Sequence, residues 1–219
     1  KNEDTYLVVR LSHVASKATN ETCVKNGLKN LAEFKHELLM LRTACHIVIA
    51  VFSGLRESEF ASLEIGCLEE REGFDGESFF WLKGTTYKLE RTPKPAQWLV
   101  PEIVKTAVDI ATRLGQPDRI ECEQKIHSIK LLLNSAHVLE QYRNELLSEL
   151  EEMQKHKNSL LTTSSEKGRV LALGSAAANC SLRKFSKAAG ALVESSDMEE
   201  ISNSDKVHIG KVWPLSSHQ

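Results

Sequence analysis

The sequence predicts an α+β fold, a mainly α-helical chain that contains one small three-stranded antiparallel sheet. Over most of the 219 residues, apolar side chains recur at every third or fourth position, which is the period of an amphipathic helix. Between residues 64 and 101 that period stops, and short apolar runs separated by Gly, Asp and Pro take its place. A hydrophobic content of 41% is enough for a buried core at this length. We therefore expect helices on both sides of a single β-meander.

Composition limits the classes of protein to which the chain can belong. The formal net charge is -2, so a nucleic-acid partner would need a local basic face rather than an overall basic excess. No apolar run approaches the length of a membrane span and no signal peptide opens the chain, which predicts a soluble protein. The five cysteines include no C-x-x-C pair, which disfavours a disulfide framework or a zinc ribbon and fits a reducing cytoplasm. They are Cys23, Cys45, Cys67, Cys122 and Cys180.

The pattern divides the chain into an N-terminal segment, residues 1–18, and a domain, residues 19–219. Lys1 is not an initiator residue, so we expect the chain to be part of a longer protein. The run YLVVRL at residues 6–11 fits either a short strand or the first turns of a helix, and the pattern leaves both open.

One or two helices are predicted from Thr19 onward, and they lead into the apolar run from Ile47 to Phe52. His36 and His46 lie in these helices. We interpret both as surface or packing residues, because no second ligand lies at metal-binding spacing.

The segment from Ala44 to Leu63 contains a predicted corner. A helix that stops at Ser53 and Gly54 and is followed by a second helix forms a tight turn, because glycine adopts the left-handed conformation that closes a helix. The corner would hold Arg56 near the surface, and Glu59, one turn later, can accept a hydrogen bond from its guanidinium. We expect the apolar residues on both sides of the arginine to reach the core and fix its place: Val51, Phe52, Leu55, Phe60 and Leu63.

A guanidinium held in this way suits an anionic ligand. Arginine matches phosphate and carboxylate oxygens with two parallel hydrogen bonds, whereas lysine offers a point charge. An ordinary ion pair between Arg56 and Glu59 is the alternative, and for this segment taken alone it is the more common arrangement.

The residues after Leu63 predict three short strands, at about 65–69, 78–86 and 97–100. Turn-forming Gly, Asp and Pro residues separate them. The second predicted strand carries Lys83 within it and Lys88 at its end. For either one alone, a solvated hairpin lysine is the usual interpretation.

A helix is expected to begin at Pro101 and to end at Gly115 and Pro117. Residues 118–157 carry apolar side chains at steps of three and four without a breaker, which predicts one long amphipathic helix or two. Their heptad-like spacing could serve a coiled-coil partner, although packing within a core is the commoner outcome. The polar residues 155–168 predict a flexible loop.

Ser181 is placed to cap a further helix, residues 182–195, that would bury Leu182 and Leu192 among others. Its outer face carries three basic residues, which are candidate contacts to a DNA backbone, although three solvated charges on a helix are ordinary. These are Arg183, Lys184 and Lys187. The chain closes with VWPLSSHQ.

Three stretches, in order, resemble the active-site boxes of the tyrosine recombinases, the phage integrase family. SGLRESEF at residues 53–60 resembles the first box, a small residue followed by Gly-Leu-Arg, two residues and Glu. Lys88, followed by a Trp-x-Val pattern, resembles the catalytic lysine of members with a longer hairpin, whereas Lys83 resembles that of members with a shorter one. The closing WPLSSHQ resembles the approach to the His-x-x-Arg box, with His218 on the box histidine.

The resemblance implies a site-specific DNA recombinase or integrase that acts on double-stranded DNA in the cytoplasm, encoded by a bacterium or a phage as part of a mobile element. Members of the family cut DNA by tyrosine attack on a phosphodiester, which forms a 3'-phosphotyrosine and frees a 5'-hydroxyl, without metal or nucleotide cofactor. They assemble as tetramers on DNA, and no membrane is involved.

Roles for individual residues follow from the same resemblance. Arg56 would clamp the nonbridging phosphate oxygens and Glu59 would orient it. Lys88, with Lys83 as the alternative, would protonate the leaving oxygen as general acid. His218 would bind the phosphate or assist the nucleophile.

The second arginine and the nucleophilic tyrosine of the family would lie beyond Gln219. Tyr6, Tyr87 and Tyr142 all precede the box histidine, so none is a candidate nucleophile. The chain is then either a truncated catalytic domain or part of a decayed element. We favour a truncated domain that is inactive alone, with a helical insertion at about 118–180 that compact members lack.

Two alternatives remain open. A type IB topoisomerase shares the fold and the set of catalytic residues, and it would relax supercoils without producing recombinants. A non-catalytic helical interaction protein would use residues 118–157 as its partner surface and would have no affinity for DNA.

Overall fold

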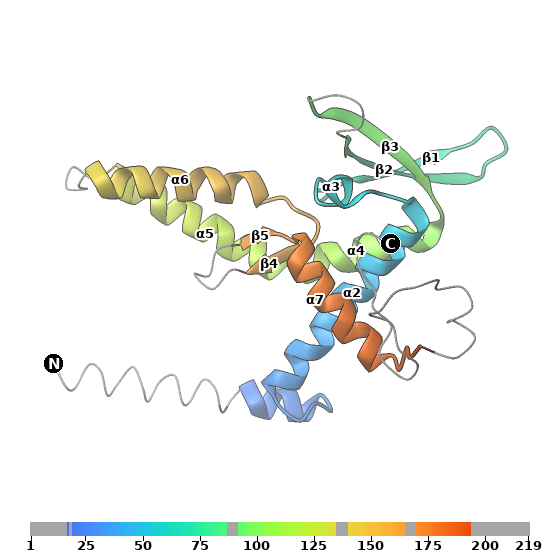
Figure 1. Cartoon of the computed structure of the whole chain (residues 1–219), viewed down its shortest axis with the longest axis horizontal. Coiled ribbons are helices and arrows are strands. Elements are labelled where there is room, and N and C mark those ends of the chain that lie inside the picture. Colours follow the sequence, from blue (N-terminus) through green and yellow to red (C-terminus); the bar gives the residue numbers. More distant parts are fainter. Residues whose placement is uncertain (1–16, 18, 87–91, 135–139, 165–169, 194–219) are drawn as a thin grey trace. The chain divides into compact units, whose positions relative to one another are not determined.

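The computed structural model describes residue 17 and residues 19–86, 92–134, 140–164 and 170–193 (Figure 1). The chain divides into two compact units, residues 1–41 and 42–219, and the division falls within one long helix, α2. Within the described residues the structure is mainly helical with a three-stranded antiparallel sheet, as the sequence predicts, and it also has a second, two-stranded sheet that the sequence did not predict. The segment 1–16 lies outside the described residues.

The first unit contains helical residues 19–25 and the beginning of α2, Leu31–Ser53. Gly27, with φ at 81°, forms the turn between them, and the Asn30 side chain accepts a hydrogen bond from the Glu33 amide at 2.9 Å. The predicted helical stretch after Thr19 is therefore two helices.

α2 is long and apolar enough to cross a membrane by length and composition, the one such helix in the described part of the chain. The expectation that no apolar segment approaches that length is therefore wrong. The same test is met by core helices of soluble proteins and by signal sequences, so it gives weak support for a membrane segment.

The predicted corner is present after α2. Gly54 has φ at 64°, and its amide donates to the Ala50 carbonyl at 3.0 Å, so the helix closes through a left-handed glycine. The second helix, α3, is a single turn, Glu57–Phe60, and does not continue to Leu63 as expected.

The apolar residues that flank the corner divide in a way the pattern did not predict. Phe60 and Leu63 are buried and Leu55 packs against the core, as expected. Val51 and Phe52 are 70% and 50% exposed, so the expectation that they reach the core is wrong. From Thr43 to Ala50 every residue of α2 is buried or half-buried, and Val51 and Phe52 follow at the C-terminal end of the helix, where the cover ends.

The meander forms one sheet, in the order β1-β2-β3, from β1 Leu68–Glu72, β2 Ser78–Thr86 and β3 Lys94–Val100. Both strand pairs are antiparallel, with Leu82 opposite Leu68 on one side and Trp98 on the other. The first strand begins three residues later than expected. The third begins earlier and includes Pro95, which an edge strand tolerates.

α4, Glu102–Leu114, follows the sheet and begins after Pro101, close to the expected position. α5, Gln116–Leu133, starts directly after Gly115. Pro117 therefore lies in the first turn of α5, where its missing amide hydrogen costs nothing, instead of terminating a helix as expected.

The predicted amphipathic stretch forms two helices, α5 and α6 Glu140–His156, which pack against each other (Figure 1). They enclose a small core of their own, and the Cys122 thiol lies 3.8 Å from the Met153 carbonyl at one end of it. The buried members of this core are Cys122, Ile126, Ile129, Leu146 and Met153. Most of the apolar residues that define the helical period of this stretch therefore pack between α5 and α6.

In residues 155–164, the described part of the predicted loop 155–168, the chain is not the flexible loop that its polar composition predicted; the rest of the prediction lies outside the described residues. Leu160 and Leu161 are buried in the main core, and the chain continues into β4 Thr162–Ser164, which pairs with β5 Val170–Ala172. Burial of two leucines overrides the loop propensity of the Ser and Thr residues around them.

A buried polar network joins this stretch to α2 and α5. The Thr162 hydroxyl donates to the Asp118 carboxylate at 2.6 Å, and its carbonyl accepts from the Arg42 guanidinium at 2.7 Å. The Arg119 guanidinium is buried and donates to the carbonyls of Ser159 and Thr112. These bonds satisfy backbone groups that α-helical or sheet pairing leaves open.

α7, Ser175–Ala188, begins at Gly174, which corrects the expectation that Ser181 caps it. Ser181 lies inside the helix, where its hydroxyl donates to the Ala177 carbonyl at 2.9 Å. The helix ends well before residue 195, so Leu192 is outside it and 50% exposed instead of buried.

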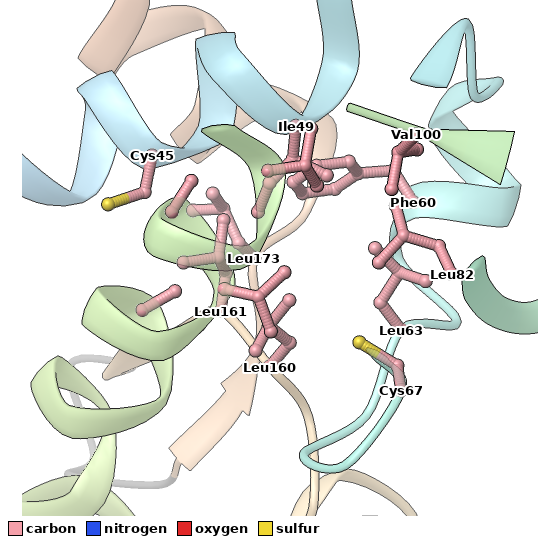
Figure 2. Close-up of a cluster of buried hydrophobic side chains, with 14 of the residues drawn as sticks. Cys45, Ile49, Phe60, Leu63, Cys67, Leu82, Val100, Leu160, Leu161 and Leu173 are labelled. Carbon is pink, nitrogen blue, oxygen red and sulfur yellow. The ribbon is translucent and has the colours of Figure 1, made fainter. Parts of the chain in front are cut away.

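The main core of the second unit lies where α2, the sheet and α4 meet the stretch that includes β4 and β5 (Figure 2). Ile49 and Leu82 are fully buried, and Leu160 is 1% exposed. The corner residues Phe60 and Leu63 lie in this cluster next to Leu82. The core therefore fixes α3 against the sheet.

Candidate functional site

Arg56 lies at the N-cap of α3 in extended conformation, with φ at -69° and ψ at 157°. Its amide donates to the Glu59 carboxylate, Oε2, at 2.9 Å, which satisfies one of the amide groups that the start of a helix leaves open. Its guanidinium nitrogen Nη1 lies 3.7 Å from Glu59 Oε1, and the side chain is 54% exposed. The guanidinium is thus held near a carboxylate and still faces solvent.

Glu59 is 5% exposed, and its carboxylate is shared between two elements. Oε2 accepts from Arg56, while Oε1 accepts from the Thr86 hydroxyl at 2.6 Å. Thr86 is the last residue of β2. A single buried carboxylate therefore joins the arginine corner to the strand end from which the β2–β3 connection departs.

A second connection lies beside the first. The Ser62 hydroxyl donates to the Glu59 carbonyl at 2.6 Å and accepts from the Thr85 amide at 2.9 Å. The strand approaches closely here because Gly84 has no side chain: a Cβ at that position would lie 3.1 Å from Ser62 Oγ and 3.2 Å from Leu63 Cδ2. The end of β2 is thereby packed directly onto the corner.

His46 supports the corner from α2. Its ring centroid lies 4.4 Å from that of Phe60, and it is buried. Its Nδ1 has no hydrogen-bond partner among the described residues. Burial lowers the pKa of His46, and the nearby positive charge of Arg42 lowers it further. The ring is a neutral packing group, in agreement with the interpretation made from the sequence.

Lys83 lies on the other face of the sheet from Thr86, because the buried Leu82 next to it faces the core and successive residues of a strand alternate. Its ammonium is 2.8 Å from Glu69 Oε2. Hydrogen bonds from Arg71 and then from Lys83 lower the pKa of Glu69 to about 2. Lys83 belongs to an exposed ionic cluster on the outer face, away from the carboxylate of Glu59.

The remaining predicted site residues are distributed as follows. Arg183, Lys184 and Lys187 are exposed on α7, whose buried Ala178 belongs to the main core. Lys88 and His218 lie outside the described residues. In the described part of the chain, no three His, Cys, Asp or Glu side chains gather closely enough to hold a metal ion.

The arrangement can bind an oxyanion. A half-exposed guanidinium with a buried carboxylate behind it has lost part of its freedom of movement, so less entropy remains to be lost when a phosphate or carboxylate binds. The sequence pattern named Arg56 and Glu59 but missed the hydroxyls of Ser62 and Thr86. The only sign of these hydroxyls in the sequence was that small polar residues stand at a helix end and at a strand end. Such residues occur in many surface turns, so they did not single out this site.

Comparisons of the chain with protein-family models, with curated proteins and with solved structures find no match.

Proposed function

We propose that the chain is part of a tyrosine recombinase, a site-specific DNA strand-breaking and rejoining enzyme. The observation that carries the proposal is the shared carboxylate of Glu59, which brings Arg56 together with the end of β2. The recombinase motifs require that neighbourhood, because the arginine and a hairpin lysine must reach one phosphate. An ordinary surface ion pair between Arg56 and Glu59 does not require it.

In this proposal the scissile phosphate of double-stranded DNA binds at Arg56. A tyrosine hydroxyl gives its proton to a general base, a role open to His218, and its oxygen attacks phosphorus. The bond from phosphorus to the 5'-oxygen breaks, and the enzyme is left as a 3'-phosphotyrosine. Arg56 neutralises the charge that gathers on the nonbridging oxygens, where preorganised charge contributes most to rate. The leaving 5'-oxygen takes a proton from a lysine ammonium, and no metal is needed.

Lys88 is the preferred general acid over Lys83. Lys83 forms an ion pair with Glu69 on the outer face of the sheet, which is the wrong face for a group that must share a phosphate with Arg56. Lys88 follows Thr86 by two residues in the sequence, so it is close along the chain to the bond with Glu59. His218 would complete the phosphate contacts as the histidine of the third box.

The exposed face of α7 is the proposed contact to the DNA backbone. Arg183, Lys184 and Lys187 supply local positive charge on a chain whose formal net charge is -2. From the resemblance to the family we also propose that the protein assembles as a tetramer on DNA. We propose further that it is cytoplasmic and is encoded by a bacterial or phage mobile element.

The test uses the chain extended by its own coding sequence beyond Gln219, where the proposal places the second arginine and the tyrosine. Covalent protein–DNA product is measured on a nicked suicide substrate, from which the cut strand diffuses away. Arg56→Ala should abolish the covalent product and leave most of the salt-dependent DNA binding. Arg71→Ala is the matched control. Arg71 is an exposed arginine on the outer face of the three-stranded sheet, so its replacement should leave the amount of covalent product unchanged. Equal trapping by both variants would remove Arg56 from the site.

One observation favours a second candidate, a helical interaction protein. The α5–α6 pair leaves large apolar side chains exposed, among them Leu131 at 59% and Tyr142 at 57%. That function predicts no DNA affinity and no effect of Arg56→Ala. The reaction product distinguishes a type IB topoisomerase from a recombinase, because a topoisomerase would relax a single-site DNA circle without forming recombinants.

A further inference from the structure

We infer that Thr86 is a positioning residue for the proposed cleavage: its hydroxyl holds the Glu59 carboxylate in the orientation that sets Arg56 on the scissile phosphate. The inference rests on the proposed function and assigns a role to a residue that the recombinase motifs do not include. Three features support it: the geometry of the hydrogen bond between Thr86 and Glu59, the burial of Glu59, and the neighbouring hydrogen bond between Ser62 and Thr85.

The geometry is that of a charge-assisted hydrogen bond. Thr86 Oγ1 lies 2.6 Å from Glu59 Oε1, within the range of a hydroxyl bonded to a carboxylate. The other oxygen of the same carboxylate accepts from the Arg56 amide at 2.9 Å. Since the carboxylate is planar, fixing one oxygen fixes the other, and the hydroxyl of Thr86 thereby acts on the backbone of Arg56.

Burial of Glu59 makes the orientation of its carboxylate depend on the protein groups that donate to it. Glu59 is 5% exposed, so water competes poorly for its oxygens and the carboxylate depends on protein donors. The Arg56 guanidinium lies 3.7 Å from Oε1, the oxygen that Thr86 holds. A rotation of the carboxylate would therefore shift the guanidinium as well as the amide.

The hydrogen bond between Ser62 and Thr85 allows the positioning role of Thr86 to be tested without unfolding the protein. Ser62 holds the Thr85 amide at 2.9 Å, and Phe60 and Leu63 pack the corner into the core. These contacts keep β2 on the corner without the hydroxyl of Thr86. Replacing that hydroxyl by a methyl group should leave the sheet docked and remove one donor from the Glu59 carboxylate.

The experiment compares Thr86→Val, which has the same shape without the hydroxyl, with Thr86→Ser, which keeps the hydroxyl, in the extended chain used above. We expect Thr86→Val to slow covalent product formation about 10- to 100-fold, because a displacement of a catalytic group by about 1 Å costs rate on that order. Thr86→Ser should stay within about threefold of the parent, and DNA binding should be unchanged for both. A Thr86→Val rate equal to that of the parent would overturn the inference.

A second substrate identifies the group through which Thr86 acts. When the 5'-bridging oxygen is replaced by sulfur, the leaving group needs no acid, so Lys88→Ala should be rescued. Thr86→Val should stay slow on this substrate, because its defect lies in the phosphate clamp. Rescue of Thr86→Val would show that it acts on the lysine instead and would overturn the route through Glu59 and Arg56.

Two controls keep the outcomes separate. Urea unfolding of each variant shows whether it folds, and Thr86→Ala, which also removes the hydroxyl, must give the same pattern as Thr86→Val if the inference holds. Absence of covalent product from the parent protein would refute the proposed function itself. Product from the parent together with full-rate Thr86→Val and Thr86→Ala would refute only the role of Thr86.

Discussion

Replacing Glu59 by alanine should lower the free energy of unfolding of this chain by about 3 kcal/mol. Among the described residues, the carboxylate accepts hydrogen bonds from the Arg56 amide at 2.9 Å and from the Thr86 hydroxyl at 2.6 Å. A hydrogen bond to a charged group contributes about 1.5 kcal/mol or more, and loss of the acceptor leaves both donors in a partly buried place. The ion pair to the exposed guanidinium adds little, because solvent screens it.

Glu59→Gln is the matched variant and should cost only about 1 kcal/mol. Its amide oxygen can still accept from the Arg56 amide, and its NH2 group can donate to the Thr86 hydroxyl, which is able to accept. Only the charge assistance is lost. Urea unfolding followed by tryptophan fluorescence measures both variants, since Trp81 and Trp98 lie in the sheet that Glu59 contacts through Thr86.

Two results would refute this reasoning. If both variants unfold within about 0.5 kcal/mol of the parent, the buried carboxylate does not join the corner to the strand. If Glu59→Gln is as destabilised as Glu59→Ala, the charge and not the pair of hydrogen bonds carries the stability.

Three further predictions concern the elements that support the site. Gly54→Ala should cost about 1 kcal/mol in unfolding free energy, because φ is 64° and no atom lies within 4 Å of the added Cβ, so backbone strain alone acts. Leu82→Ala should cost about 3 kcal/mol, because this leucine is fully buried between the sheet and the corner. Glu69 should titrate by NMR near pH 2, since hydrogen bonds from Arg71 and Lys83 lower its pKa from 4.5. Its contribution to stability is then complete above about pH 4.5 and is lost as the pH falls toward 2.

Each of these predictions has a matched second substitution. Gly54→Asn should lose less than Gly54→Ala, since asparagine tolerates the left-handed region, and the opposite order would contradict the assigned conformation. Leu99→Ala, on the exposed face of β3 at 54%, should change stability by less than about 0.5 kcal/mol. Lys83→Met should raise the pKa of Glu69, and an unchanged titration would show that the ion pair is absent in solution.

Much of the fold could be predicted from local chemistry. The turn residues around Gly73 and Gly76 and the short apolar runs that they separate were sufficient to predict the sheet, because turn residues reflect local backbone conformation and short apolar runs are typical of strands. The glycine after α2 predicted the corner for the same reason.

The errors arose where packing overrode the local pattern. Phe52 belongs to an apolar run but is half exposed, because it lies at the C-terminal end of α2, beyond the residues that the core covers. Ser181 has the chemistry of a cap but lies inside α7, since the preceding small residues extend the helix toward Gly174. Leu160 stands in a polar stretch but is buried, because the chain there crosses the main core.

The amino-acid sequence by itself determined that Arg56 would stand at a glycine-closed corner with a carboxylate one turn away, because both features depend on residues a few positions apart. Only the tertiary structure decided that the same carboxylate also accepts from Thr86, which lies 27 residues further along the chain. A contact over that separation depends on the register of the sheet and on the packing of Phe60 and Leu63 beneath the corner. No local pattern in the chain encodes either of them.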